Sequence, residues 1–239
     1  MHVLVTGGSG FVGRALCASL DGSSHSIRLA LRLANAKYGT YDQVVVGQIN
    51  AAANWSAALK DVDVVIHLAA RVHVMDEQSA DPLSEFRRVN VDGSLNLARQ
   101  AASAGVRRLI YLSSAKVNGE LTVPGQTFKE SDMANPQDAY GLSKFEAEQG
   151  LLSIAQETGM EVVIIRSPLV YGQGVKANFA SMMRVVKRGI PLPLGAIHNS
   201  RSFVYVGNLV SLITTCMYHP AAANQVFLVS DGCDLSTPQ

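Results

Sequence analysis

Three polar side chains and a glycine-rich loop in this sequence could together carry out hydride transfer at an alcohol carbon. Tyr140 and Lys144 are four positions apart, so on a helix both would project from the same face. Ser114 ends an apolar run upstream of them, and the glycines follow Thr6 near the start of the chain. The phenol can exchange a proton, the hydroxyl can hold the reacting oxygen, and the loop can hold the phosphates of a dinucleotide.

The phenol needs help to act as a base, because its ordinary pKa of about 10 leaves it protonated near neutrality. The ammonium of Lys144, together with the positive charge of an oxidised nicotinamide, is expected to lower the pKa of Tyr140. The same spacing also occurs as a surface pair on ordinary amphipathic helices. Position favours catalysis here, because Ser114 ends an apolar strand and ligands of doubly wound sheets bind at the carboxyl ends of strands.

The loop TGGSGFVG has glycines where a backbone must turn tightly against a pyrophosphate. Gly7, Gly10 and Gly13 follow an expected strand and open an expected helix, whose N-terminus favours negative charge. Gly8 and Gly10 offer a second register of the same pattern, and the spacing does not choose between the two. We predict a dinucleotide site, with a glycine-rich turn that binds nothing as the alternative.

The end of the expected second strand bears on the choice between NAD and NADP. An NAD-selective site places Asp or Glu there to bind the ribose hydroxyls of the adenosine. This chain has Arg32, which could pair with a 2′-phosphate and modestly favours NADP. A solvated arginine at a strand end explains the residue almost equally well, so the expected cofactor is NAD or NADP.

Short β-branched runs alternate with longer helical stretches, which is typical of βαβ units around a parallel sheet. The expected strands cover residues 2–6, 27–31, 43–47, 62–68, 107–112 and 161–166, and the expected helices cover 11–20, 79–104 and 139–158. Asp138 is expected to cap the third helix, and Gly105 and Gly159 to end the second and third. The sequence predicts an α/β fold with a doubly wound, Rossmann-like parallel sheet.

The chain is expected to divide into a dinucleotide-binding domain over 1–166 and a substrate-binding region over 167–239. After Arg166, prolines and glycines punctuate short segments, with expected helices near 178–188 and 206–218. We expect this smaller part to be interleaved with the sheet. The last residues contain a helix-start pattern with no helix behind it, so we expect the chain to be truncated at its C-terminal end.

Composition favours a small-molecule ligand over a polymer. The 239 residues include 20 Lys and Arg against 19 Asp and Glu, a net charge of +1 that offers no basic surface to nucleic acid or to an anionic membrane. The 3 cysteines lack C-x-x-C spacing and the 6 histidines lack ligand spacing, so neither a disulfide framework nor a metal site is expected. With no signal-peptide pattern ahead of the first strand, the expected location is the cytoplasm.

Several pieces of the sequence form a specific set when they are taken together. They are TGGSGFVG (6–13), HLAA (67–70), VNVDGSLNL (89–97), YLSSAKVNG (111–119), YGLSK (140–144), RSPLVYG (166–172) and RSFVYVGNLV (201–210). With this set the chain resembles the NAD-dependent epimerase/dehydratase family of extended short-chain dehydrogenases/reductases, which act on nucleotide sugars. The resemblance covers residues 1 to 231.

The resemblance implies a full set of site residues. Ser114, Tyr140 and Lys144 are implied to be catalytic. The implied cofactor-binding residues are Gly7, Gly10, Phe11, Val12, Gly13, Arg32, Gln48, Ile49, Leu68, Ala69, Ala70, Asn90, Ser113, Lys144 and Pro168. Ser114, Asn178 and Arg201 are implied to bind a UDP-linked sugar, although a helix cap and a surface arginine are the plainer interpretations of the last two.

The chain departs from the family pattern at three places. Gln48 stands where many members have an Asp near the adenine, so that contact is neutral at best. Gly207 and Asn208 replace the usual Asp of the Arg201 motif, and Asn118 stands where a Tyr is common.

The residues beside Ser114 bear on the reaction. Dehydratases of the family place an acidic residue there, whereas this chain has Ala115 and Lys116, so elimination is disfavoured. The remaining reactions are 4-epimerisation of UDP-glucose or a UDP-N-acetylhexosamine, and reduction of a 4-keto sugar, in bacterial polysaccharide synthesis. A non-catalytic dinucleotide sensor on the same fold is the alternative. Members often pair through two long helices, so a homodimer through the segments around 79–104 and 138–158 is expected.

Overall fold

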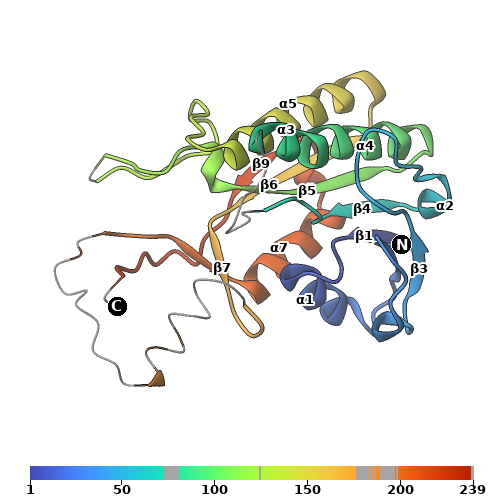
Figure 1. Cartoon of the computed structure of the whole chain (residues 1–239), viewed down its shortest axis with the longest axis horizontal. Helices are drawn as coiled ribbons and strands as arrows, with labels where there is room; N and C mark the ends of the chain where they lie inside the picture. The colour runs from blue at the N-terminus through green and yellow to red at the C-terminus, as the bar shows by residue number, and fades with distance from the viewer. Residues whose placement is uncertain are drawn as a thin grey trace.

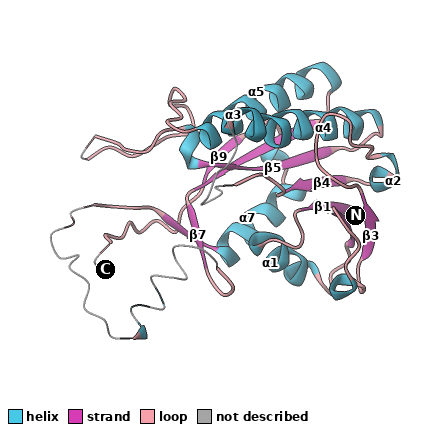
Figure 2. Ribbon diagram, in the orientation of Figure 1, coloured by secondary structure: helices cyan, strands magenta, loops and turns pink. Residues whose placement is uncertain are grey.

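The computed structural model describes residues 1–72, 81–123, 125–175 and 199–237, and the isolated positions 183, 185, 187, 188 and 197. Within these residues, the centre is a 7-stranded sheet in the order β3-β2-β1-β4-β5-β6-β9 (Figures 1 and 2). The strands are β1 (His2–Thr6), β2 (Ser26–Leu31), β3 (Asp42–Val45), β4 (Val64–His67), β5 (Arg108–Ser114), β6 (Glu161–Ser167) and β9 (Val226–Leu228). All neighbouring pairs are parallel. The predicted doubly wound α/β fold is confirmed.

Helices cover both faces of the sheet. Strands such as β4 and β6 are therefore buried along almost their whole length. Figure 1 shows α1 and α7 on one face and α3, α4 and α5 on the other. Leu16 and Ile213 belong to the core of the first face, and Leu97 and Leu151 to the core of the second. The helices are α1 (Phe11–Leu20), α2 (Ser56–Leu59), α3 (Pro82–Phe86), α4 (Ser94–Ser103), α5 (Ala139–Thr158) and α7 (Val206–Tyr218).

The helix expected over 79–104 is interrupted by a wider turn. Between α3 and α4 lies a π-helical segment, η2 (Arg87–Gly93), and residues 79 and 80 are outside the described residues. A Cβ at Gly93 would lie 2.5 Å from the Ile49 side chain, so this glycine lets η2 approach the loop after β3. Segments of this kind often occur at functional sites, and sequence periodicity did not predict it.

The expected helix ends are where the sequence placed them. The Asp138 carboxylate accepts a hydrogen bond of 2.6 Å from the backbone N–H of Gly141 and caps α5. Gly159 ends α5 with φ 75°, and Gly105 follows α4 with φ 80°. Helices α1, α5 and α7 have the predicted bounds.

Three short strands after Ser167 were not predicted. β7 (Leu169–Tyr171) pairs in parallel with β8 (Phe203–Tyr205), and β9 joins the main sheet beside β6. Three-residue strands carry too little periodicity to be recognised in sequence. The helix expected near 178–188 lies outside the described residues, apart from isolated positions. In the part of the chain that is described, no helix has the length and apolar character needed to span a bilayer.

Candidate functional site

The catalytic candidates meet at one edge of the sheet. Thr6, His67 and Ser114 end β1, β4 and β5, and parallel strands bring their carboxyl ends to the same edge. Tyr140 and Lys144 lie in the first turns of α5, which packs against β5 and β6.

The glycine loop after β1 is shaped by close backbone contacts. Gly7 has φ +72°, and a Cβ there would lie 2.7 Å from the backbone nitrogen of Ala69. A Cβ at Gly13 would lie 2.2 Å from the carbonyl oxygen of Gly7. At Gly8, by contrast, an added Cβ would meet the flexible end of the Leu29 side chain. Close backbone contacts therefore require glycine at residues 7 and 13, whereas a side chain at residue 8 would need only Leu29 to move, which favours the register that begins at Gly7.

The start of α1 is suited to an anion. Gly10 is its N-cap, and within the described first turn there is neither a capping side chain nor an acidic residue. The first backbone N–H groups therefore keep their capacity to bind a ligand, with Phe11 and Val12 half-buried beside them. This loop and helix start fit the pyrophosphate of a dinucleotide.

A buried network holds the neighbouring strand end against the glycine loop. The Thr6 hydroxyl lies 2.6 Å from Nδ1 of His67 and accepts a hydrogen bond of 3.2 Å from the Ala69 N–H. Nε2 of His67 lies 2.8 Å from the Ser94 hydroxyl. Burial, and then the charge of Lys144, lower the pKa of His67 to about 3, so the imidazole is neutral. Leu68, Ala69 and Ala70 are half-buried beyond it.

Asn90 is held by hydrogen bonds to two other segments of the protein. Its Oδ1 accepts the Arg71 N–H at 2.8 Å, and its Nδ2 donates to the Arg71 carbonyl and to the Ser143 hydroxyl, both at 3.0 Å. The side chain is buried. Its polar atoms have protein partners, and its expected place in the lining of the cofactor site stays a prediction.

The start of α5 is locked to the turn that follows Ser114. Lys116, in the 3₁₀ turn η3 (Ala115–Val117), forms an ion pair with Asp138, the N-cap of α5. The Ser114 hydroxyl accepts a hydrogen bond of 3.2 Å from the Lys116 N–H. These contacts hold Ser114 near Tyr140. Lys116 therefore has a structural partner in Asp138.

The Tyr140 phenol is half-buried, and its ring packs edge-on against Phe86 with centroids 6.0 Å apart. Burial raises its pKa to about 12, a hydrogen bond with Ser114 acts in the opposite direction, and the Asp138 charge raises it further. The protein alone therefore does not lower this pKa, and the expectation that Lys144 and an oxidised nicotinamide lower it together stays a prediction. The protein environment disfavours the phenolate, because desolvation outweighs the hydrogen bond.

Lys144 is almost wholly buried and points back under the strand end. Its Nζ donates to the Leu112 carbonyl at 2.8 Å and lies 4.3 Å from the centre of the Tyr111 ring and 6.0 Å from that of Tyr140. Burial lowers its pKa to about 7, against the opposing effect of the Glu148 carboxylate. The amine thus changes its charge near neutral pH.

Ser113 faces away from Ser114, because neighbouring strand residues alternate between the faces of a sheet. Its hydroxyl donates a hydrogen bond of 2.5 Å to Glu148, and the residue is 2 % exposed. Glu148 forms a buried ion pair of 2.6 Å with Arg166. The hydroxyl of Ser113 therefore belongs to this cluster, and its expected place in the cofactor site stays a prediction. The four-residue spacing of Tyr140, Lys144 and Glu148 could have identified this carboxylate.

The residues expected near the adenosine follow β2 and β3, which lie on the opposite side of β1 from β4 and β5. Arg32 is exposed directly after β2, which agrees equally with a contact to a ribose phosphate and with a solvated strand end. Gln48 accepts a hydrogen bond of 3.3 Å from Arg88, and Ile49 packs on Gly93. Neither residue is acidic.

The segment with Arg201 is held by the C-terminal part of the chain. The Arg201 N–H and carbonyl bond to Leu235 at 2.9 and 3.0 Å. The Asp231 carboxylate accepts hydrogen bonds from the Tyr171 hydroxyl at 2.9 Å and from the Asn208 amide at 2.8 Å. Burial opposes ionisation of Asp231, but these hydrogen bonds outweigh it and lower its pKa. Asp231, not predicted from sequence, thus supplies a carboxylate beside the motif that lacks its usual Asp.

Two implied ligand residues complete the set. Pro168 follows β6, next to Ser167, which pairs in register with Ser114. Asn178 lies outside the described residues. Among the described side chains, no group of His, Cys, Asp or Glu is arranged to hold a metal ion.

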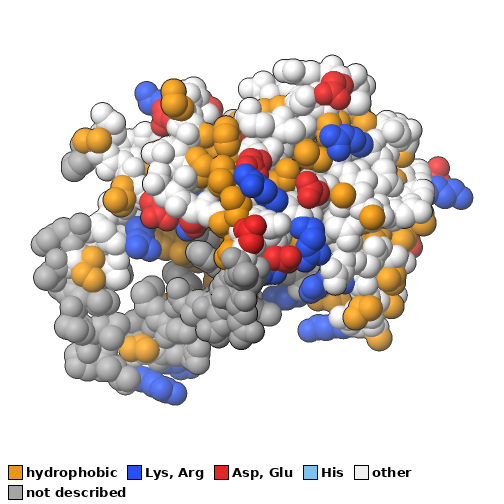
Figure 3. All heavy atoms as spheres, turned by 45° about the horizontal axis from the view of Figure 1, so that its top comes forward, with side chains coloured by type: hydrophobic (Ala, Val, Ile, Leu, Met, Phe, Trp, Pro, Cys, Tyr) orange, Lys and Arg blue, Asp and Glu red, His pale blue; other side chains and the backbone are white. Residues whose placement is uncertain are grey.

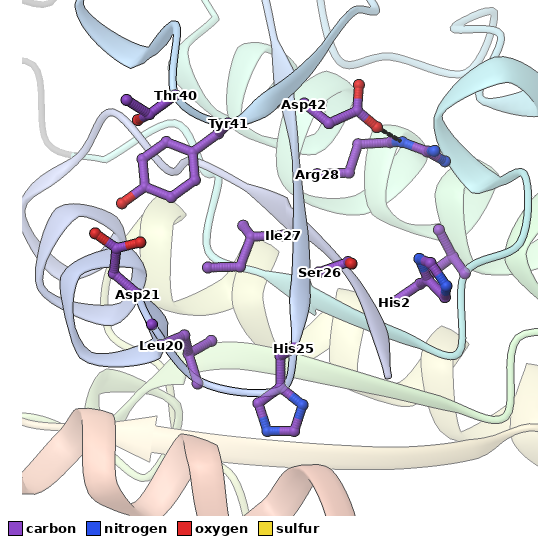
Figure 4. Close-up of a pocket in the computed structure, with 12 residues that line it drawn as sticks. His2, Leu20, Asp21, His25, Ser26, Ile27, Arg28, Thr40, Tyr41 and Asp42 are labelled. Atoms are coloured by element: carbon purple, nitrogen blue, oxygen red, sulfur yellow. Dashed lines mark hydrogen bonds and ion pairs between the residues drawn. The ribbon is translucent and has the colours of Figure 1, made fainter.

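A separate cavity of about 440 Å³ opens at the opposite edge of the sheet (Figure 4). Its polar wall includes Arg28, which pairs with Asp42 at 2.6 Å. It lies by the first residues of β1 and β2, and none of the described residues that line it is a predicted site residue. The cavity therefore lies apart from the catalytic candidates and the glycine loop.

Comparison with known proteins connects this geometry to a family. The model of the NAD dependent epimerase/dehydratase family matches residues 3–230. The chain belongs to this family. The resemblance seen in the sequence is thereby confirmed, and with it a nicotinamide dinucleotide as the cofactor.

Similar proteins align over nearly the whole of this chain. A UDP-glucose 4-epimerase of Vibrio cholerae is 53% identical over 240 residues, which are 99% of this chain and 73% of that protein. A 3-beta-hydroxysteroid dehydrogenase of Mycolicibacterium neoaurum is 30% identical, over 97% of this chain and 66% of that protein. The solved structure of MoeE5 in complex with UDP-glucose and NAD has a TM-score of 0.84 and 26% identity, over 100% of this chain and 79% of that one.

Proposed function

We propose that this protein is an NAD-dependent nucleotide-sugar 4-epimerase, such as a UDP-glucose 4-epimerase. The observation that carries the proposal is the meeting of Ser114, Tyr140 and Lys144 beside a glycine loop that fits a pyrophosphate. The 53% identity to the Vibrio cholerae UDP-glucose 4-epimerase supports the same substrate class. A non-catalytic sensor is not favoured, since all three catalytic candidates are present and close together.

When bound, the dinucleotide supplies a hydride acceptor for oxidation of the sugar carbon and a hydride donor for its reduction. Tyr140 takes the proton of the C4 hydroxyl during oxidation. It returns the proton after the keto sugar has rotated in the site. Ser114 donates a hydrogen bond to the C4 oxygen as charge develops on it. Because the protein raises the pKa of Tyr140 to about 12, the phenolate needs both the Lys144 ammonium and the positive nicotinamide.

The proposed cofactor site follows the carboxyl ends of β1, β2 and β4. Gly7, Gly10 and Gly13 hold the pyrophosphate, with Phe11 and Val12 beside it. Gln48 and Ile49 flank the adenine, Arg32 lies at its ribose, and Leu68 to Ala70 line the wall. Lys144 and Pro168 approach the nicotinamide end, while Asn90 and Ser113 support the site from behind it.

We propose NAD as the cofactor. The solved MoeE5 complex contains NAD, and no comparison supports the preference for NADP that Arg32 suggested. In this proposal Arg32 is a solvent-exposed arginine at the end of β2 and binds no 2′-phosphate. NADP-dependent reduction of a 4-keto sugar is thereby the weaker interpretation of the site.

The substrate is proposed to lie between the strand ends and the region 167–239. Arg201 and Asn178 bind the diphosphate, a role that suits a cationic fork. We also propose that the dinucleotide-binding domain ends at residue 166. Two later elements nevertheless belong to the main layers, since α7 packs on the sheet and β9 is one of its strands.

We also propose a homodimer formed by α4 and α5. Figure 3 shows hydrophobic side chains interspersed with charged ones on the side of the molecule where α3, α4 and α5 lie. Leu142, Phe145 and Leu152 are half-buried on α5, and Arg87 pairs with Glu146 across this surface at 2.5 Å. A cytoplasmic location agrees with three free thiols, at Cys17, Cys216 and Cys233.

The test is conversion of UDP-galactose to UDP-glucose by the purified protein, with mass spectrometry of whatever dinucleotide copurifies. The expected result is interconversion without net consumption of cofactor and with NAD in the protein. Turnover that consumes NADPH stoichiometrically on a 4-keto sugar would replace the epimerase by a reductase. Activity on neither class would remove the proposal.

A further inference from the structure

A buried carboxylate lies next to the catalytic pair and has no part in the mechanism proposed above. Glu148 is one helical turn beyond Lys144 on α5, and only 1 % of it is exposed. An ionised group at this depth is costly unless it has partners.

The partners of Glu148 join the elements that carry the site. Arg166, at the end of β6, donates to it from Nη2 at 2.6 Å and from Nε at 3.1 Å. Ser113, at the end of β5, donates at 2.5 Å. Arg166 also donates to the Asn118 side chain at 3.1 Å, in the loop that follows Ser114 and η3. The cluster thus connects α5 to two strand ends and to this loop.

Stability alone does not require this ion pair. Well-packed apolar residues in place of a buried ion pair are often as stable or more so, because the pair loses much solvation. Its location one turn from Lys144 therefore indicates a use for the negative charge.

Among the described titratable groups around Lys144, Glu148 is the one that supplies a negative charge. His67 from β4 is neutral because burial and then the Lys144 charge lower its pKa, and Tyr111 from β5 is neutral because burial raises its pKa. Tyr140 on α5 is protonated for the same reason, and Arg166 from β6 is positive. Burial lowers the pKa of Lys144, and the Glu148 charge opposes that effect.

We propose that Glu148 is a positioning residue, whose carboxylate keeps Lys144 in the ammonium form and, through Ser113, holds the end of β5 that carries Ser114. The inference rests on the proposed function, since that reaction needs the ammonium to stabilise the Tyr140 phenolate. It adds a fourth residue to the machinery, one that acts through its neighbours.

The test is Glu148→Gln, which keeps the shape and removes the charge. Titration of the Lys144 side chain by NMR in protein with ¹³C-labelled lysine, assigned with Lys144→Arg, should show a midpoint lower by about one pH unit or more, a tenfold or larger change in the proton equilibrium. The alkaline limb of the kcat profile should move to lower pH by the same amount. At a pH below both Lys144 midpoints the binding constant of NAD should stay within about twofold, because Lys144 is then charged in both proteins and Glu148 is proposed to touch neither ligand.

Glu146→Gln is the matched control, since Glu146 lies on the same helix but pairs with Arg87 at the surface. It should leave both the titration and the pH profile as they are. If Glu148→Gln does not fold, because Arg166 is left unpaired, the double variant Glu148→Gln/Arg166→Met removes both charges. Its Lys144 midpoint is then compared with that of Arg166→Met, which lacks the same positive charge, and should be the lower of the two.

An unmoved or raised Lys144 midpoint against its reference, wild type or Arg166→Met, in whichever of these variants folds would overturn the proposal, even if kcat fell. The titration needs neither substrate nor turnover. Its outcome is therefore separate from that of the proposed function, which fails if the wild-type protein does not epimerise UDP-sugars.

Discussion

The side-chain amide of Asn90 donates a hydrogen bond of 3.0 Å to the hydroxyl of Ser143, across 53 positions of the sequence. Ser143 in turn donates to the carbonyl of Tyr140 at 2.8 Å. The π-helical turn that carries Asn90 is thus tied to the first turns of α5, while the other contacts of Asn90 hold the backbone of Arg71 beyond β4. One amide thus connects the segment after β4 with the start of α5, which carries Tyr140.

Asn90→Ala should lower both stability and turnover, because it leaves buried partners unsatisfied and frees the start of α5. We expect a loss of about 2–3 kcal/mol in the free energy of unfolding by urea. We also expect a fall in kcat on the order of 10- to 100-fold from misplacement of Tyr140. Asn96→Ala is the control, because Asn96 also donates two hydrogen bonds to backbone carbonyls but far from Tyr140. If the two variants lost kcat equally, the coupling through Ser143 would be refuted.

Tyr140→Phe should remove most of the turnover, since it removes the proton-transferring hydroxyl and leaves the ring packed against Phe86. General acid–base catalysis contributes about 10²- to 10⁴-fold, and kcat should fall by this order. Dinucleotide binding, measured by calorimetry, should be retained. Turnover at the wild-type rate would end the assignment of Tyr140 as acid and base.

Acid should destabilise the protein through His67. Its pKa is about 3 in the folded state and 6.5 ordinarily, so between these values the unfolded chain binds the extra proton. Stability should therefore decrease as pH falls through this window, by about 1.4 kcal/mol for each pH unit from this residue. Comparing the pH slope of unfolding free energy in wild type and His67→Gln isolates the contribution. Equal slopes between pH 4 and 6 would mean that His67 is not buried in its neutral form.

Arg201→Ala should weaken the binding of UDP-sugars without unfolding the segment around it, because the bridge to Leu235 uses backbone atoms. Loss of a charged hydrogen bond corresponds to about 1.5–3 kcal/mol, which titration calorimetry with UDP can measure. Ser202→Ala is a suitable comparison, since Ser202 bonds instead to Asp234 at 2.7 Å. An unchanged dissociation constant for UDP in Arg201→Ala would show that Arg201 is an ordinary surface residue.

Sequence alone determined the order of the first six strands and of helices α1, α5 and α7, and it identified the catalytic candidates. Apolar runs separated by helical periods predict a parallel sheet, and local chemistry places the cap at Asp138 and the left-handed Gly159, because each of these signals involves neighbours in the chain. Glycine spacing likewise predicted the phosphate loop. The spacing could not select the register of the glycine loop. The register depends on the close contact between Gly7 and Ala69, which the pairing of β1 with β4 brings together.

Tertiary structure decided which polar side chains are free to act. Ser113 and Asn90 belong to family motifs. Their hydrogen-bond partners, Glu148 and Ser143, both lie on α5 and come into contact with them only when the elements pack. The same holds for charge, because burial moves the pKa values of Tyr140 and Lys144 in the directions that disfavour both ions. Residue types and spacing specify which groups are present, whereas desolvation and long-range partners, which depend on the assembled fold, set their protonation and orientation.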